Sequence, residues 1–242
     1  VLANFSSGQN GLLAAALIAG ALGFMERRPV LAGCFLGLLT FKPQLGILFP
    51  LILAVDGRWR MFFAAAVTVV FLFAASCLAF GIDTWIAFFH SLPDYSRVHL
   101  QEGEAYWMKM QSVFTLVRLL GGSATLAWIV HGTFIGSIAL SLCMIWRSAA
   151  SFDMKAAALA LGSLLVSPYL FLYDFAVLAV PLAFLLHETR TTGFLPYELA
   201  GIAAACLLIF IFPLVMAPVG LAAAFIVLAL ILRRIASTGN AR

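Results

Sequence analysis

The sequence predicts an all-α, polytopic transmembrane helical bundle, and two observations carry this prediction. Hydrophobic residues make up 64% of the 242 residues, charged residues only 10%, and the mean hydropathy is +1.09. Almost every stretch longer than ten residues is apolar, so the rules of bilayer insertion apply rather than those of soluble domains. We treat residues 1–242 as a single transmembrane domain. Because its start shows no signal-peptide pattern, we expect a fragment that lacks N-terminal spans.

About nine membrane segments can be drawn, and two of the divisions need an argument. Residues 30–55 could form one span, but proline disfavours a helical residue before it, so Lys42-Pro43 should break the helix. Residues 198–235 would be more than about 50 Å long as one helix, against a hydrocarbon core of about 30 Å, so Pro213 and Pro218 mark a reversal. The predicted segments are 10–25, 30–41, 44–55, 61–80, 124–146, 156–166, 169–187, 198–212 and 219–235.

The positions of the basic residues support these divisions. If the segments alternate in direction, ten of the fourteen Lys and Arg residues share one side, which the positive-inside rule makes cytoplasmic. These ten are Arg27, Arg28, Arg58, Arg60, Arg147, Lys155, Arg190, Arg233, Arg234 and Arg242. The other side holds Lys42, Arg97, Lys109 and Arg118. Drawing 30–55 as one span would destroy this bias, so we predict a hairpin there.

The hairpin arms 30–41 and 44–55 are too short to cross a bilayer. Each would be about 18 Å long, so their junction at Lys42-Pro43 should lie below the outer surface. Broken helices at membrane depth are tolerated where they line a protein cavity. The sequence therefore predicts a cavity that opens to the extracytoplasmic side. Residues 81–122 form the one long extracytoplasmic loop, with aromatics that suit the membrane interface and a short amphipathic helix at Ser112 to Leu120.

Polar residues cluster on this predicted outer side, and each cluster has a functional and a structural interpretation. Gln9 and Asn10 could bind sugar hydroxyls; alternatively, Ser7 or Asn10 could cap a helix. Lys42, followed by Gln44, could bind a phosphate, or its ammonium could extend to the headgroups. An unpaired ammonium at membrane depth would cost about 2.5–3.5 kcal/mol, so we expect Lys42 to be paired or hydrated.

Further candidates follow Ser167-Pro168 and lie in the outer loop. Tyr169 and Tyr173 are four residues apart and should share a helix face. Asp174 should lie about one turn into the same helix, where it could pair with Lys42 as a structural bridge or act on a ligand. Lys109 and Arg118 could complete a phosphate clamp, with Gln111 beside them as a further contact. The remaining charged residues of the loop are expected to be solvated. The four cysteines stand alone in different apolar segments, and we expect no metal ligands.

These clusters, taken in order, resemble glycosyltransferase family 87 of the GT-C superfamily. The resemblance rests on Gly8-Gln9, the stretch Arg27 to Gly37, Lys42-Pro43, the stretch Trp107 to Ser112, and Ser167-Pro168-Tyr169 with Tyr173-Asp174. It covers most of the chain to about residue 187. The five motifs occur in this order and on one predicted face.

The resemblance implies a membrane enzyme that transfers a hexose, typically mannose, from a polyprenyl-phosphate donor to a lipid-linked or glycan acceptor. The expected partners are therefore the lipid bilayer, the polyprenyl-phosphate sugar and the acceptor, without a cofactor or nucleic acid. The implied location is multi-pass in a cell membrane, a bacterial inner membrane, with the active site on the extracytoplasmic side. In the superfamily the catalytic acid lies in the first outer loop, upstream of Val1. We therefore expect Asp174, the best candidate carboxylate here, to support the pocket, and the fragment itself to be inactive.

Two other functions remain open from the sequence. A transporter or flippase for a polyprenyl-linked substrate would also have a basic cavity sunk into the membrane, but it should show paired repeats with broken helices. We find no convincing second copy of the Lys42-Pro43 hairpin. A non-enzymatic membrane subunit would explain the topology but leave Lys42 and Asp174 without a purpose.

Overall fold

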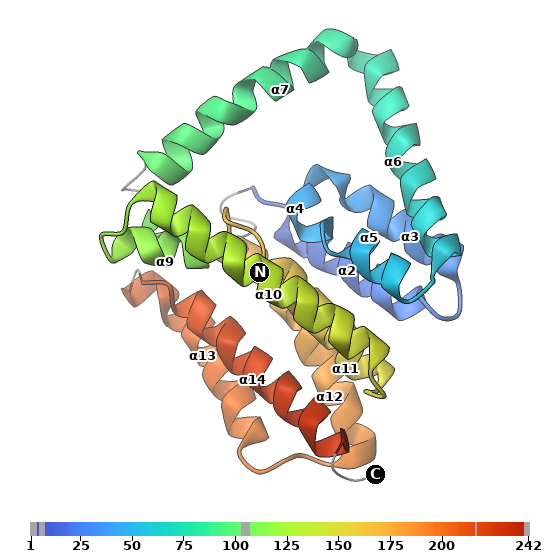
Figure 1. The fold of residues 1–242 in the computed structure, drawn as a ribbon, viewed down its shortest axis with the longest axis vertical. Coiled ribbons are helices and arrows are strands. Elements are labelled where there is room, and N and C mark those ends of the chain that lie inside the picture. Colours follow the sequence, from blue (N-terminus) through green and yellow to red (C-terminus); the bar gives the residue numbers. More distant parts are fainter. Residues whose placement is uncertain (1–3, 5–7, 103–106, 216, 240–242) are drawn as a thin grey trace.

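The computed structural model describes residues 4, 8–102, 107–215 and 217–239, and it is built from helices (Figure 1). The helices are α2 (Gly11–Phe24), α3 (Pro29–Leu38), η1 (Leu39–Phe41), α4 (Pro43–Gly46), α5 (Phe49–Val55), α6 (Trp59–Phe80), α7 (Ile82–Ser96), η2 (Arg97–Gln101), α9 (Val113–Leu119), α10 (Ala124–Arg147), α11 (Phe152–Leu165), η3 (Leu172–Leu178), α12 (Ala179–Thr192), α13 (Glu198–Val215) and α14 (Val219–Gly239). The predicted all-α class is confirmed.

Within the described residues, four helices are long and apolar enough to cross a membrane. They are Trp59–Phe80, Ala124–Arg147, Leu172–Thr192 and Val219–Ser237. Shorter apolar helices, among them Gly11–Phe24 and Pro29–Phe41, accompany them. The chain is a membrane protein by these criteria, although a count of nine membrane segments is not confirmed. The predicted turn near Pro213 falls two residues later, because α13 continues through Val215.

The chain reverses at Lys42-Pro43 as the proline predicted. Pro43 begins α4, and the backbone of Lys42 is non-helical, with φ −134° and ψ 67°. After α5 the chain returns to the point from which α3 started. There Arg58 lies 3.7 Å from the carboxylate of Glu26 and donates to the carbonyl of Met25 at 3.4 Å. The hairpin prediction is confirmed, because both arms begin and end at one place.

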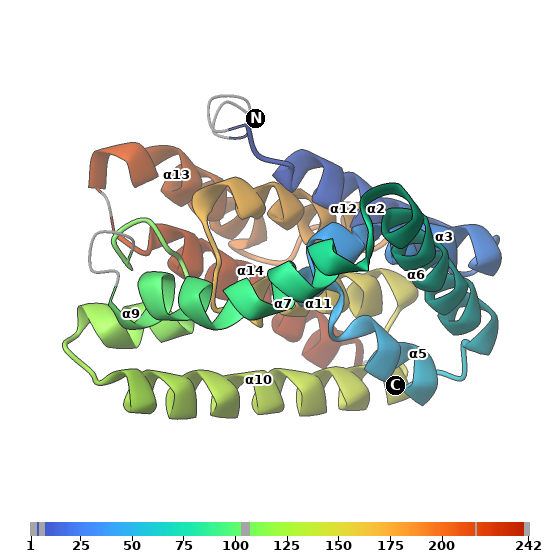
Figure 2. The same ribbon diagram turned by 90° about the horizontal axis from the view of Figure 1, so that it is seen from above.

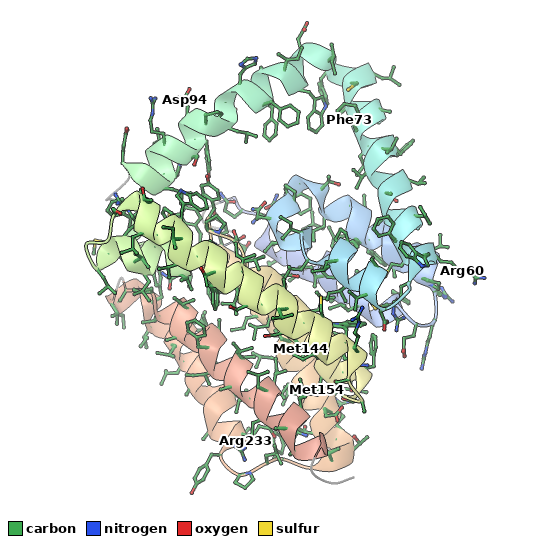
Figure 3. All side chains as sticks on the ribbon, viewed as in Figure 1. Arg60, Phe73, Asp94, Met144, Met154 and Arg233 are labelled. Carbon is green, nitrogen blue, oxygen red and sulfur yellow. The ribbon has the colours of Figure 1, made fainter. Side chains whose placement is uncertain are left out.

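The turns that carry most basic residues meet at this same end of the bundle. Arg58 lies over the rings of Trp146 and Phe152, at 5.9 and 5.8 Å from their centroids. Nδ1 of His187 in α12 lies 2.6 Å from Oδ2 of Asp153 at the start of α11. Arg60, Met154 and Arg233 accordingly lie along one edge of the bundle in Figure 3, with Asp94 on the opposite edge. We call the edge with Arg60 and Arg233 the basic end and the opposite one the site end.

Small residues let α3 pack closely on α6. A side chain at Gly33 would lie 2.5 Å from the carbonyl of Met61, and one at Gly37 would overlap Thr68. Glycines spaced four residues apart present a flat surface to a neighbouring helix, which is how helices associate in the absence of a hydrophobic driving force. Beyond this contact α6 leaves the bundle, and only Met61 of its residues is buried. Its outer half and α7 thus stand away from the other helices (Figure 1).

The core of the bundle is α11, which contacts α4, α10, η3, α12 and α14. All residues from Ala156 to Leu165 are buried. Figure 2 shows α10 along one edge, α13 and α2 along the other, and α11 and α14 between them. Because α11 is rich in alanine, helices can approach it from several sides. The short segment predicted at 156–166 is therefore the most enclosed one.

After α11 the structure differs from two predictions, the helix expected to begin at residue 169 and the helix face expected to be shared by Tyr169 and Tyr173. Residues 167–171 are not helical, η3 is a 3₁₀-helix, and a regular α-helix begins only at Ala179. Tyr169 and Tyr173 consequently do not share a helix face, and that prediction is wrong. The reason is Pro168, which lacks an N–H, together with the carboxylate of Asp174, which accepts from the backbone N–H of Phe171 at 3.2 Å and starts the new helix there.

The described part of the loop at 81–122 is largely helical. α7 crosses the site end in Figure 1, and none of its residues is buried. Its position at the membrane surface stays a prediction from its aromatic residues. The short helix predicted at Ser112 to Leu120 is confirmed as α9, whose first turn is capped by the hydroxyl of Ser112, which accepts from the N–H of Thr115 at 3.1 Å.

Candidate functional site

A buried ion pair between Lys42 and Asp174 forms the centre of the site end. The ammonium Nζ of Lys42 donates to Oδ1 of Asp174, and the two residues are 9% and 4% exposed. Lys42 comes from the break between η1 and α4, and Asp174 from the first turn of η3, 132 residues further along the chain. The cation and the carboxylate that the sequence placed on one side of the membrane are therefore in direct contact.

Both carboxylate oxygens of Asp174 are engaged. Oδ1 accepts from Lys42, and Oδ2 accepts from the N–H of Phe171 at 3.2 Å. The second bond satisfies an amide at the start of η3 that would otherwise have no intrahelical acceptor. Breaking such a pair leaves a buried charge uncompensated, which is strongly destabilising. Asp174 thus fixes both the ammonium of Lys42 and the local backbone.

Tyr173 covers one side of the ammonium. Its ring centroid lies 5.0 Å from Nζ of Lys42, within the range of a cation–π contact, and its ring stacks on Phe171 at 5.4 Å. The start of α2 is anchored beside it, since Asn4 Nδ2 donates to the Tyr173 carbonyl at 3.0 Å. Gly11 contacts this same carbonyl so closely that a side chain there would overlap it. The role of Asn4 could not be predicted, because it depends on a contact 169 residues along the chain, and that of Phe171 was missed because the helix was expected to begin before it.

Three amide side chains predicted to bind substrate lie near this centre with different exposure. Gln9 and Asn10 are exposed at the entrance to α2, and Gln44 is half-buried in α4, two residues after Lys42. Asn10 occupies the N-cap position of α2 without a side-chain capping bond in the described residues. Ser7, the other capping candidate, lies outside the described residues. The amide of Asn10 is thus left for another partner.

Gln111 holds the loop to the bundle. It is fully buried, its Oε1 accepts from the N–H of Gly220 at 2.8 Å, and its Nε2 donates to the carbonyl of Met110 at 3.1 Å. Its own backbone N–H donates to the carbonyl of Leu170 at 2.6 Å. Both ends of the amide are therefore used within the protein, which makes Gln111 a structural bridge in this conformation.

The remaining candidate residues are Lys109, Arg118 and Tyr169, and the contacts of these side chains are with other residues than Lys42 and Asp174. Lys109 is exposed. The guanidinium of Arg118 lies 4.2 Å from the centroid of Trp107 and donates to the carbonyl of Gly122 at 3.0 Å. The ring of Tyr169 packs 5.5 Å from that of Tyr95 in α7 and so connects the non-helical stretch to the loop. A phosphate clamp of Lys42 with Lys109 and Arg118 remains a prediction.

Two cavities reach the helix break that carries Lys42. The α5–α6 cavity, of about 410 Å³, lies between α3, α4, α5 and α6, and it includes Pro43 and Gly46. The α6–α7 cavity, of about 780 Å³, lies between α2, η1 and the turn from α6 into α7, and it includes Phe41. Lys42 is thus flanked in sequence by a lining residue of each cavity. In the described residues, no group of three or more His, Cys, Asp or Glu side chains is placed to hold a metal ion.

Comparison with known proteins points to one family. The model of glycosyltransferase family 87 matches residues 1–168, which is more than two thirds of the 242 residues. No curated protein and no solved structure matches. The matched region contains Lys42 and the loop, but it ends before Tyr169, Tyr173 and Asp174.

Proposed function

This chain belongs to glycosyltransferase family 87, and we propose that it transfers mannose from a polyprenyl-phosphate donor to a lipid-linked or glycan acceptor. The observation that carries the proposal is the buried Lys42–Asp174 pair, whose lysine lies between Phe41 and Pro43, which line two different apolar cavities. An anionic group attached to a hydrocarbon chain is the ligand that such a place would attract. The site faces away from the basic end, so the reaction is assigned to the extracytoplasmic side.

Lys42 is the proposed phosphate-binding residue. An ammonium group has three N–H donors, and one of them is directed to Asp174. The others are left for the phosphate of the donor. Because the pair is shielded from water, an ammonium there stabilises negative charge more strongly than it would in solution.

The bond changes in the proposed glycosyl transfer define the role of Lys42. The bond between the anomeric carbon and the phosphate oxygen breaks, its electron pair stays on the phosphate, and the acceptor oxygen bonds to the anomeric carbon. The acceptor proton passes to a general base. Lys42 opposes the negative charge that grows on the leaving phosphate.

Asp174 is proposed as a positioning residue rather than that base. Its two oxygens already accept from Lys42 and from the N–H of Phe171, so neither is directed to an acceptor hydroxyl in this arrangement. We assign sugar and acceptor contacts to Gln9, Asn10 and Gln44, whose amides are exposed or half-buried.

The remaining residues are placed around this centre. Tyr173 restricts the approach of the phosphate to one side of the ammonium. Lys109 and Arg118 stay candidates for further phosphate contacts, Tyr169 for the sugar contact, and Gln111 is assigned to support of the loop.

An assay of the full-length protein with labelled polyprenyl-phosphate mannose tests the proposal. We expect transfer by the wild type and background transfer by Lys42→Ala protein, compared at equal amounts of folded enzyme. Lys155→Ala at the basic end is the matched control, since it also removes a lysine but should keep wild-type transfer. Full transfer by the Lys42→Ala protein would remove Lys42 from the site and with it the basis of the proposal.

A further inference from the structure

A separate cavity lies at the basic end, where the proposed function assigns no residue. It has a volume of about 400 Å³ and lies between the turn from α2 into α3 and the turn from α5 into α6. We call it the turn cavity, and its charged lining residues are Glu26, Arg58 and Arg60. The stretch Arg27 to Gly37, on which part of the family resemblance rests, starts between two lining residues, Glu26 and Pro29. The arginines of this stretch have no role in the proposed transfer.

One arginine takes up both carboxylates near the turn cavity. Nε of Arg58 donates to Oδ2 of Asp56 at 2.5 Å, and a terminal nitrogen of the same guanidinium lies 3.7 Å from Oε1 of Glu26. Arg58 also donates to the carbonyl of Met25 and lies over the ring of Trp146. Arg58 is therefore occupied within the protein, and it offsets the charge of Glu26, the carboxylate that lines the cavity.

Three further guanidinium groups have no such partner. The side chains of Arg27, Arg28 and Arg60 are exposed, and none of them forms an ion pair or a hydrogen bond with the described residues. Arg60 lines the turn cavity and lies at the outer edge of the bundle in Figure 3. Residues 25–29 and 56–61 together contain four arginines and two carboxylates, which leaves an excess of two positive charges.

Two helix N-termini add to this positive potential. α3 begins at Pro29 and α6 begins at Trp59, and both residues line the turn cavity. Their N-cap residues are Arg28 and Arg58; neither helix has a side-chain capping bond, and neither has an acidic residue in its first turn. The N-terminus of a helix carries a partial positive charge that favours an anion. Arginines at these positions add repulsion, which a bound anion would relieve.

We infer that the turn cavity binds the phosphate group of an anionic membrane lipid, independently of the proposed glycosyl transfer. Guanidinium groups bind phosphate oxygens through paired N–H donors, and Arg60 in the lining and Arg28 next to it supply them. Exposed aromatic side chains favour a lipid over a soluble ion. Trp59 is 51% exposed, and Phe63, one turn further along α6, is 60% exposed. Such rings are typical of the membrane–water interface, where lipid headgroups lie.

The test uses the full-length protein in vesicles that contain brominated lipids, which quench the fluorescence of nearby tryptophans. The ratio of the apparent affinities for brominated phosphatidylglycerol and brominated phosphatidylcholine measures the preference for an anionic headgroup. One arginine at an anionic surface contributes a factor of about five. We therefore expect this preference to fall about fivefold in Arg60→Gln protein and to be lost in Arg28→Gln/Arg60→Gln protein. Trp59→Phe should remove most of the headgroup-dependent quenching, because Trp59 lines the cavity.

Arg147→Gln/Arg190→Gln is the matched control. Both arginines are exposed near the C-termini of α10 and α12, at the same end of the bundle, and neither lines the turn cavity. The control removes as much charge as Arg28→Gln/Arg60→Gln, so a general attraction to an anionic surface should fall equally in the two proteins. We expect the control to keep the wild-type preference. Thermal unfolding in phosphatidylcholine vesicles verifies that each variant is folded.

Equal affinity of the wild type for the two lipids would overturn the site, because arginines that only set the topology need no headgroup preference. An equal loss in the control would overturn it as well, in favour of a general surface attraction. Displacement of brominated phosphatidylglycerol by inorganic phosphate, but not by chloride at the same ionic strength, would assign the cavity to a free phosphate ion and overturn the lipid. None of these measurements requires glycosyl transfer, so a failure of the proposed function would leave this test unaffected.

Discussion

Removal of the ammonium of Lys42 provides the sharpest test of the site's physics. In Lys42→Met protein the side chain keeps its length, but Asp174, which is 4% exposed, loses its cation. The bond from the N–H of Phe171 remains and cannot compensate a full charge. Removing one partner of a buried ion pair lowers the free energy of unfolding by about 3–5 kcal/mol. On the scale of soluble domains of this size, about 2–4 °C per kcal/mol, the Tm should fall by about 6–20 °C.

The double variant distinguishes this explanation from a simple packing defect. In Lys42→Met/Asp174→Leu protein no charge is left, and replacing a buried pair by apolar residues is often neutral or stabilising. We expect its Tm to recover part of the loss, because the charge is gone but the N–H of Phe171 lacks its acceptor, while transfer stays at background. Thermal unfolding in detergent, followed by tryptophan fluorescence, measures the Tm of the single and the double variant. Lys109→Met is the control for an exposed lysine and should change stability by less than about 0.5 kcal/mol. An unchanged Tm in the single variant, or a double variant as unstable as the single one, would refute the reasoning.

Three further predictions concern the frame of the site. Reporter fusions should place Gly57 and Glu102 on opposite sides of the membrane, as their positions at the basic end and in the loop require; a shared side would contradict the hairpin. Gly37→Val should destabilise the protein by about 1–3 kcal/mol or more, because the added carbons overlap Thr68, and a thermal shift assay would detect it; wild-type stability would show that α6 does not pack on α3 as described. Gln111→Ala should cost about 1–3 kcal/mol by leaving a buried backbone N–H of α14 without its acceptor, as measured by thermal unfolding; wild-type stability would argue against this bridge.

The stability of the site and its chemistry place opposite demands on Lys42. A buried pair is retained at a cost in desolvation, so apolar residues would serve the fold as well or better. That the chain keeps a buried ammonium at this helix break is therefore difficult to explain by packing alone. A phosphate on a lipid chain gives the charge a use that no packing argument supplies.

Much of the fold could be read from local features of the sequence. Proline after Lys42 predicted the helix break, and the distribution of arginines predicted which turns would meet at one end. Both predictions succeed because they depend on the residue itself: proline lacks an N–H and restricts its neighbour, and charged groups avoid the bilayer core. The count of segments also predicted that Lys42 and Asp174 lie on the same side as each other, and their direct contact agrees with this.

The contacts of the site, by contrast, were decided by tertiary structure. Tyr169 and Tyr173 were predicted on one helix face, but the carboxylate of Asp174 accepts from the backbone and begins a 3₁₀-helix between them. Gln111 looked like a substrate contact, whereas the arrival of α14 occupies its amide. Composition and spacing indicate which segments are apolar enough to lie in a membrane. Which partner satisfies a buried polar group depends on segments more than a hundred residues apart, and only their packing brings those segments together.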